Sequence, residues 1–116
     1  MSQDSLLIKK MAELVDKGET FALATVVDVE GSSPGKPGFK MLIMKDGSTL
    51  GTVGGGSLEE RVKKIALDVI KERKPRKVEL ALVEEGKGGV GMLCGGKATV
   101  SVSYTHLRAH ETSLHL

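Results

Sequence analysis

Apolar residues recur at helical spacing in two stretches of the chain. The first stretch is followed by Gly18, a candidate C-terminal cap, and its apolar positions are Leu7, Ile8, Met11, Leu14 and Val15. The second is an apolar stripe from Leu58 to Ile70, which runs out through basic residues into Pro75. The pattern therefore predicts one helix near the N-terminus and another in the middle of the chain.

Five apolar or β-branched runs are typical of β-strands. The run FALATVVDV at 21–29 is apolar almost throughout, as in a strand covered on both faces, which predicts a central place in the sheet. The segment KMLIMKDGSTLGTV is predicted to hold two strands, because its Asp46-Gly47 pair accepts the positive φ of a tight hairpin turn. VELALV at 78–83 and KATVSV at 97–102 complete the five.

The order of these elements is a helix, three strands, a helix and two strands. It predicts an α+β fold with a single mixed β-sheet of about five strands and two packed helices. At 116 residues the chain is long enough for one small core. Its last segment, SYTHLRAHETSLHL, resembles a foreign tail appended to truncated reading frames. We therefore expect a domain at 1–103 and a non-native tail at 104–116, and leave the tail and its three histidines out of the functional interpretation.

Charge and composition exclude several classes of partner. The net charge is +2, from 17 basic and 15 acidic residues, so no overall field draws the chain to nucleic acid or a membrane surface. Aromatic residues make up only 3% of the chain, too few for base stacking, and no apolar run approaches the roughly 20 residues of a membrane span. A single cysteine and an N-terminus without a secretory signal predict a cytoplasmic protein.

Glycine is unevenly distributed. All fifteen glycines but Gly18 lie between residues 31 and 96, mostly in predicted loops at 31–38, 51–56 and 86–96. Glycine in a loop usually serves a positive φ or a close approach of the backbone to something else. If the strands before these loops point the same way, the loops meet at one edge of the sheet and expose backbone N–H groups.

The segment GTVGGGSLEERV, at 51–62, allows two interpretations. Ser57 with Glu60 fits a capping box, in which the helix start is satisfied by its own side chains. Alternatively, a glycine run before a helix offers N–H groups and a dipole to an anion such as phosphate, although Glu59 and Glu60 already bring negative charge there. The run fits neither a Walker loop nor a dinucleotide-binding fingerprint.

The two other glycine segments carry further candidate chemistry. In GSSPGKPGFK, prolines stiffen a loop whose Ser32, Ser33, Lys36 and Lys40 could hold an oxyanion, and an ordinary surface turn is the alternative. In MLCGG, Cys94 beside free backbone N–H groups could serve as a metal ligand or sulfur acceptor. The alternative for that thiol is a small buried apolar residue.

Three motifs in order, ATVVDVEGSSPGKPGFKML, TLGTVGGGSLEERV and GMLCGG, resemble the N-terminal domain of the XdhC/CoxI family over about residues 5–102. The resemblance implies a maturation factor for molybdenum hydroxylases such as xanthine dehydrogenase or carbon monoxide dehydrogenase. Such a factor binds the molybdenum cofactor (molybdopterin) transiently and helps with its sulfuration and delivery. The implied partners are an apo-hydroxylase, a cysteine desulfurase and a second copy in a homodimer. Many members carry a second, Rossmann-like domain, so the resemblance also implies that this chain is a fragment.

Carried onto this sequence, the resemblance implies a cofactor site that draws on all three loops. Its residues are Ser32, Ser33, Lys36, Lys40, Gly54, Gly55, Gly56, Ser57, Glu59, Cys94, Gly95 and Gly96. Glu59 would accept from the pterin ring, Lys36 and the glycine N–H groups would hold its phosphate, and Cys94 would lie nearest the metal. The family often has a basic residue in place of Gly35 and a cysteine in place of Ser57.

Three functional classes follow. The first is a cofactor-binding maturation factor without turnover of its own, which the resemblance favours. The second is a small sulfur or nucleotidyl transferase, which the lack of a paired general acid and base disfavours. The third is a protein-docking module that holds no ligand and uses its glycines as turns.

Overall fold

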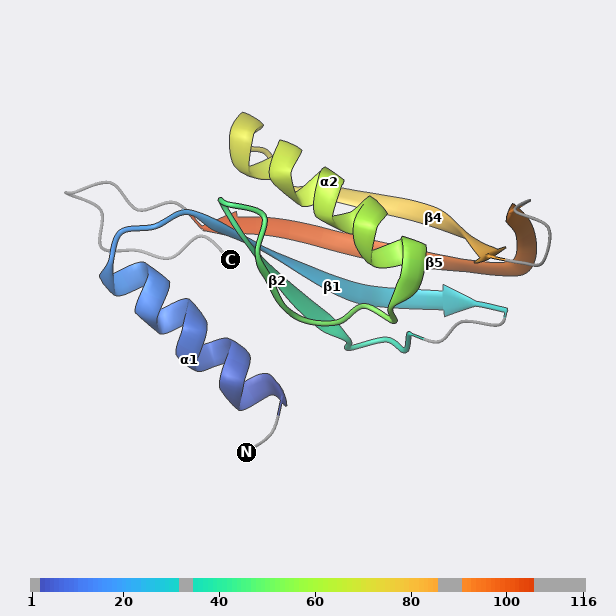
Figure 1. The fold of residues 1–116 in the computed structure, drawn as a ribbon, viewed down its shortest axis with the longest axis horizontal. Helices are drawn as coiled ribbons and strands as arrows, with labels where there is room; N and C mark the ends of the chain where they lie inside the picture. The colour runs from blue at the N-terminus through green and yellow to red at the C-terminus, as the bar shows by residue number, and fades with distance from the viewer. Residues whose placement is uncertain (1–2, 32–34, 86–90, 106–116) are drawn as a thin grey trace.

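The computed structural model of the protein describes residues 3–31, 35–85 and 91–105, of which 83–85 and 91–95 are described by their backbone alone. Two helices and five strands follow one another in the predicted order, which confirms the α+β class (Figure 1). They are α1 (Gln3–Asp16), β1 (Phe21–Glu30), β2 (Lys40–Met44), β3 (Thr49–Gly51), α2 (Gly56–Glu72), β4 (Arg76–Glu85) and β5 (Gly91–Thr105). Within the described residues, neither helix is long and apolar enough to cross a membrane.

The five strands form one sheet in the order β3-β2-β1-β5-β4. The central position of β1 is confirmed. The expectation of a mixed sheet is wrong, because every pair of neighbours is antiparallel. The chain crosses through α2 from β3 at one edge of the sheet to β4 at the other. β3 and β4 run in the same direction, but they are not neighbours, so the crossover creates no parallel pair.

The helices pack on opposite faces of the sheet. Alternation along β1 places Phe21 and Ala22 on different faces, and the same holds for Leu42 and Ile43 in β2. Ala22 and Ile43 belong to the main core, which includes Val62 and its neighbours on α2. Phe21 and Leu42 belong to a smaller cluster that includes α1. Figure 1 shows α2 running beside the long strands, well separated from α1.

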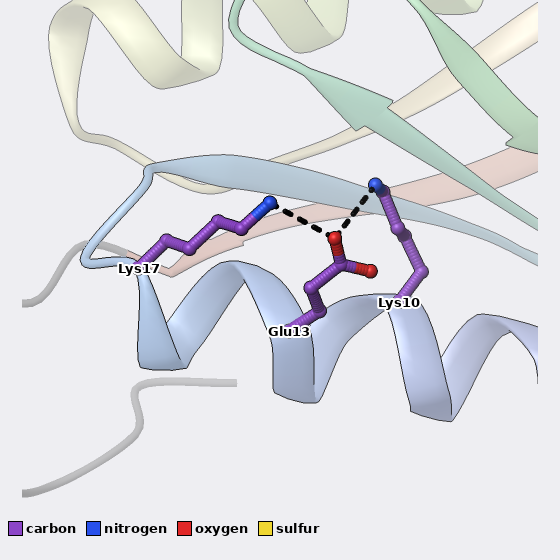
Figure 2. A network of polar contacts seen from close by, with 3 residues as sticks. All are labelled: Lys10, Glu13 and Lys17. Carbon is purple, nitrogen blue, oxygen red and sulfur yellow. Dashed lines mark hydrogen bonds and ion pairs between the residues drawn. The ribbon is translucent and has the colours of Figure 1, made fainter.

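Helix α1 ends as its sequence predicts. Gly18 adopts φ 69°, and its N–H donates to the carbonyl of Val15. The apolar stripe is narrower than expected, since Ile8 is 61% exposed. On the outer surface, Lys10 and Lys17 both contact Glu13, at 3.6 and 3.0 Å (Figure 2). The hydrogen bond from Lys17 and the charge of Lys10 lower the pKa of the Glu13 carboxyl.

The hairpin between β2 and β3 turns at the predicted pair. Gly47 has φ 92°, and its N–H donates to the carbonyl of Met44. Asp46 Oδ1 accepts two hydrogen bonds from Ser48, from the backbone N–H at 2.9 Å and from the hydroxyl at 2.6 Å. These hydrogen bonds lower the pKa of the Asp46 carboxyl.

Strand β5 is longer at both ends than the predicted run at 97–102. The expectation of a single glycine-rich loop through 96 is wrong, because the chain re-enters the sheet at Gly91 and pairs with Glu85 of β4. The ladder hydrogen bonds there offset the entropy cost of ordering glycine. At the other end, Thr105 pairs with Phe21, so the first two residues of the tail expected at 104–116 lie in the sheet. Residues 106–116 lie outside the described part, and the foreign origin of the tail stays a prediction.

Candidate functional site

The described parts of the three glycine segments lie at one end of the sheet. Strands β1, β3 and β4 run in the same direction, because each is separated from the next by one antiparallel neighbour. The chain therefore leaves these three strands at the same end of the sheet, as the sequence led us to expect. This end of the sheet, called the glycine end below, is on the right in Figure 1, where α2 and β5 begin. The opposite end of the sheet, where β1 begins and β2 turns into β3, is called the hairpin end.

The first and second glycine segments touch through their backbones. A Cβ added to Gly35 would lie 2.2 Å from the carbonyl oxygen of Val53 and 3.5 Å from Cα of Gly54. No side chain fits in that space, so this backbone conformation requires glycine at position 35. Gly35 and Val53 are both buried, so the contact joins the two loops in the interior of the glycine end.

Helix α2 begins two residues earlier than an N-cap at Ser57 would place it. Gly56 is its first residue and Gly55 its N-cap, with φ 87° and no side-chain cap. The capping box of Ser57 and Glu60 is therefore wrong. Three successive glycines at positive φ bring the chain into the helix along a path that residues with a Cβ rarely follow, and Ser57 consequently lies inside the first turn.

Glu59 makes the contact that was expected of Glu60. Its Oε2 accepts the N–H of Gly55 at 2.8 Å and the hydroxyl of Thr52. Thr52 Oγ1 in turn accepts the N–H of Gly54 at 3.0 Å. Two of the three glycine N–H groups that could bind an anion are thus bonded within the chain. The carboxylate of Glu59 lies at the positive end of the helix dipole, where negative charge is stabilised.

The lysines of the first segment differ in their surroundings. Lys40 donates from Nζ to the carbonyl of Gly38 at 3.1 Å. Lys36 is exposed, and its side chain has no partner among the described residues. Ser32 and Ser33 lie outside the described residues. Lys36 is therefore the candidate cation of this segment with a side chain available to a ligand.

The third motif lies in β5 beyond the end of β1. Lys97 pairs with Glu30, the last residue of β1, so the residues that precede Lys97 continue beside β4 alone. Cys94, Gly95 and Gly96 stand opposite a single residue of β4, Leu82, which makes a bulge in the ladder. The side chain of Cys94 lies outside the described part. Within that part, no three His, Cys, Asp or Glu residues come together to hold a metal ion.

Two residues at this end were not identified from the sequence. Thr52 ties Gly54 to Glu59, and a hydroxyl two residues before a glycine was the available signal for it. Arg61 donates from Nη2 to the carbonyl of Ala81 at 2.7 Å, which links α2 to the edge strand β4. Its Nε is buried without a partner among the described residues. Nothing local in the sequence marks a contact across 20 residues.

This fold, with glycine segments joined at one end of an antiparallel sheet, has counterparts among known proteins. The sequence profile of the XdhC and CoxI family matches residues 14–83. The chain belongs to the XdhC and CoxI family.

Individual relatives are longer than this chain. The protein YqeB of Escherichia coli (strain K12) is 36% identical over 102 residues, which are 88% of this chain and 19% of YqeB. A probable xanthine dehydrogenase subunit of Bacillus subtilis (strain 168) is 45% identical over 49 residues, 42% of this chain and 15% of that protein. The crystal structure of a xanthine dehydrogenase from Bacillus halodurans matches 90% of this chain with a TM-score of 0.69 and 32% identity. The match covers 30% of that chain.

Proposed function

We propose that this chain is the cofactor-binding part of a maturation factor for a molybdenum hydroxylase of the xanthine dehydrogenase type. In this proposal it binds the molybdenum cofactor at the glycine end and passes it to the apo-enzyme in the cytoplasm. Family membership supports the coarser role, and the relatives described as a xanthine dehydrogenase or its subunit support the identity of the partner.

One observation carries the proposal. The glycine segments after β1 and β3 are joined by the contact of Gly35 with Val53, and the third motif begins β5 at the same edge. Glycines used only as separate turns need no such contact. The contact holds the two loops in a fixed relation, and binding residues are often carried on loops that a rigid scaffold positions.

The second segment fits a pterin ring. Oε2 of Glu59 is held by Thr52 and Gly55, whereas Oε1 has no partner among the described residues. A carboxylate oriented in this way can accept hydrogen bonds from the amino and ring N–H groups of a pterin. A Cβ added to Gly55 or Gly56 would meet no atom of the described residues within 4 Å, so a flat ligand can approach the backbone there.

Other residues of the site would hold the remaining parts of the cofactor. The exposed ammonium of Lys36 and the N–H of Gly56 suit the phosphate, whereas a phosphate at Gly55 would first have to displace Glu59. Ser57 lies in the first turn of α2 beside them. When bound, the cofactor supplies a dithiolene for molybdenum and a phosphate, and the thiol of Cys94 is the soft ligand proposed for the metal.

The test is titration calorimetry of the full chain with isolated molybdenum cofactor. We expect Glu59→Gln to weaken binding about tenfold, because the ring loses a charged acceptor. Glu60→Gln is the matched control, since Glu60 is exposed on the next position of the same helix and is expected to change affinity less than about twofold. Lys36→Ala and Cys94→Ser test the phosphate and metal contacts.

Two outcomes would contradict the proposal. The assignment of the site to the glycine end would be refuted if the parent bound the cofactor no more tightly than the variants Glu59→Gln, Lys36→Ala and Cys94→Ser. Capture of an apo-hydroxylase by a chain that binds no pterin would instead indicate a docking module.

A further inference from the structure

A pocket of about 380 Å³ lies at the hairpin end, remote from the glycine segments. It is formed by the residue before β1, the turn after β2 and the last turns of α2. Its lining residues are Thr20, Lys45, Leu67, Ile70, Lys71 and Arg73. Three of the six are cationic and none is acidic, so the pocket concentrates positive charge on a chain whose net charge is only +2.

The cations of this pocket have no counter-ions in the described part of the chain. Three other lysines of the described residues do contact carboxylates: Lys10 and Lys17 contact Glu13 (Figure 2), and Lys97 contacts Glu30 and Glu79. Lys45, Lys71 and Arg73 form no ion pair or side-chain hydrogen bond within the described residues. Three like charges around one pocket repel one another, and an anion between them would relieve that repulsion.

The helix dipole explains this cluster only in part. Basic residues are favoured at the C-terminal end of α2, which accounts for the charge of Lys71 and Arg73. Lys45 comes from the turn after β2, so its place in the pocket depends on tertiary packing and not on the sequence of α2. Arg73 is also the one non-glycine residue at positive φ (56°) within the described residues, at a position where Gly or Asn is usual.

We propose that this pocket binds a compact, multiply charged phosphate group, either free or at the end of a small molecule. A guanidinium and two ammonium groups match phosphate oxygens, and Leu67 and Ile70 offer apolar contact to the rest of a ligand. The proposal is independent of cofactor binding, which concerns the opposite end of the sheet.

The neighbouring groove argues for a compact ligand and against an acidic peptide. This groove, of about 590 Å³, shares Thr20 and Lys45 with the pocket. It is also lined by Glu19 and Asp46, which would repel an acidic chain leaving the pocket. Positive charge is therefore concentrated in the smaller pocket.

The test is calorimetric titration of the full chain with inorganic pyrophosphate, with ADP as a second probe. Lys45→Gln and Arg73→Gly should each weaken pyrophosphate binding about tenfold through the loss of a charge-assisted contact. Glycine suits the positive φ of residue 73, so Arg73→Gly should melt no lower than the parent. The matched control is Lys77→Gln, on the face of β4 turned away from α2, with an expected change below about twofold.

Each result decides for or against the pocket. Binding of pyrophosphate at least as tight as that of ADP would assign the pocket to free phosphate groups, and tighter binding of ADP would assign it to a phosphorylated small molecule. Absence of binding by either probe would overturn the proposal. Equal loss in the Lys77→Gln control, or tighter binding of hexaglutamate than of pyrophosphate, would do the same.

Discussion

At the glycine end of the sheet, Gly35 lies against the backbone of Val53. At the hairpin end, a Cβ added to Gly47 would meet, among the described residues, only the flexible side chain of Lys63. Both positions need glycine, for different physical reasons. Gly35 permits two loops to approach, while Gly47 permits a positive φ in a turn. The difference teaches that the glycine end depends on contacts between distant segments, and the hairpin end on local conformation.

The largest expected effect is that of Gly35→Ala. The new Cβ would lie 2.2 Å from Val53 O, so one loop must move, at a cost of about 2 kcal/mol of unfolding free energy. Urea denaturation measures this loss. The matched control is Gly38→Ala in the same loop, where a Cβ meets nothing within 4 Å and only the strain of φ 96° is added. Equal losses in the two variants would show that loop contact does not distinguish the glycine end.

At the hairpin end, Gly47→Ala should cost about 1 kcal/mol, because alanine is strained at φ 92°. Gly47→Asn should recover most of this loss, since asparagine tolerates positive φ in turns. Thermal unfolding of the three proteins provides the measurement. A failure of asparagine to recover stability would indicate that Gly47, like Gly35, is needed for space.

A smaller difference is expected within the start of α2. Glu59→Ala removes the acceptor for Gly55 and Thr52 and should cost about 1 kcal/mol. Ser57→Ala should change stability by less than about 0.5 kcal/mol, because the serine does not cap the helix. Melting temperatures compare the two directly, and a larger loss for Ser57→Ala would restore the capping box.

The smallest effect concerns pH at the hairpin end. Hydrogen bonds from Ser48 hold the pKa of the Asp46 carboxyl below 3.8 in the folded protein. The stabilisation is therefore complete above the unfolded pKa and is lost as the pH falls through the lower, folded value. Carboxyl titration by NMR should locate the folded pKa, and Ser48→Ala should return it toward 3.8. An unchanged pKa in that variant would contradict the assigned cause.

The sequence allowed prediction of what depends on local pattern. The spacing of apolar residues and the residue types at turns located both helices, the central strand and the Asp46-Gly47 turn, because these features depend on residues close together in the chain. Two predictions that rested on glycine were wrong, the loop through residue 96 and the start of α2. Gly91 lies in a strand because β4 pairs with it, and α2 starts at Gly56 because positive φ angles carry the chain into the helix. Both outcomes depend on backbone geometry that composition does not encode.

For the candidate site, the sequence indicated which segments would gather but not how they touch. The shared direction of β1, β3 and β4 confirmed the gathering. The contact of Gly35 with Val53 joins residues 18 positions apart, and that of Arg61 with Ala81 joins residues 20 apart. Such contacts follow from the tertiary packing, so neither could be predicted from spacing. The roles of Ser32, Ser33 and Cys94 stay predictions.

The position of β5 has a consequence for synthesis of the protein. This strand is the last one in the described part of the chain, yet it lies between β1 and β4 in the sheet. On a ribosome, β1 and β4 are made without the strand that joins them, and the apolar surface of α2 lacks part of its cover. The nascent chain therefore cannot close its core until Thr105 has left the exit tunnel. Folding at that point is a late insertion of high contact order, and a chaperone that shields open strand edges would act before it.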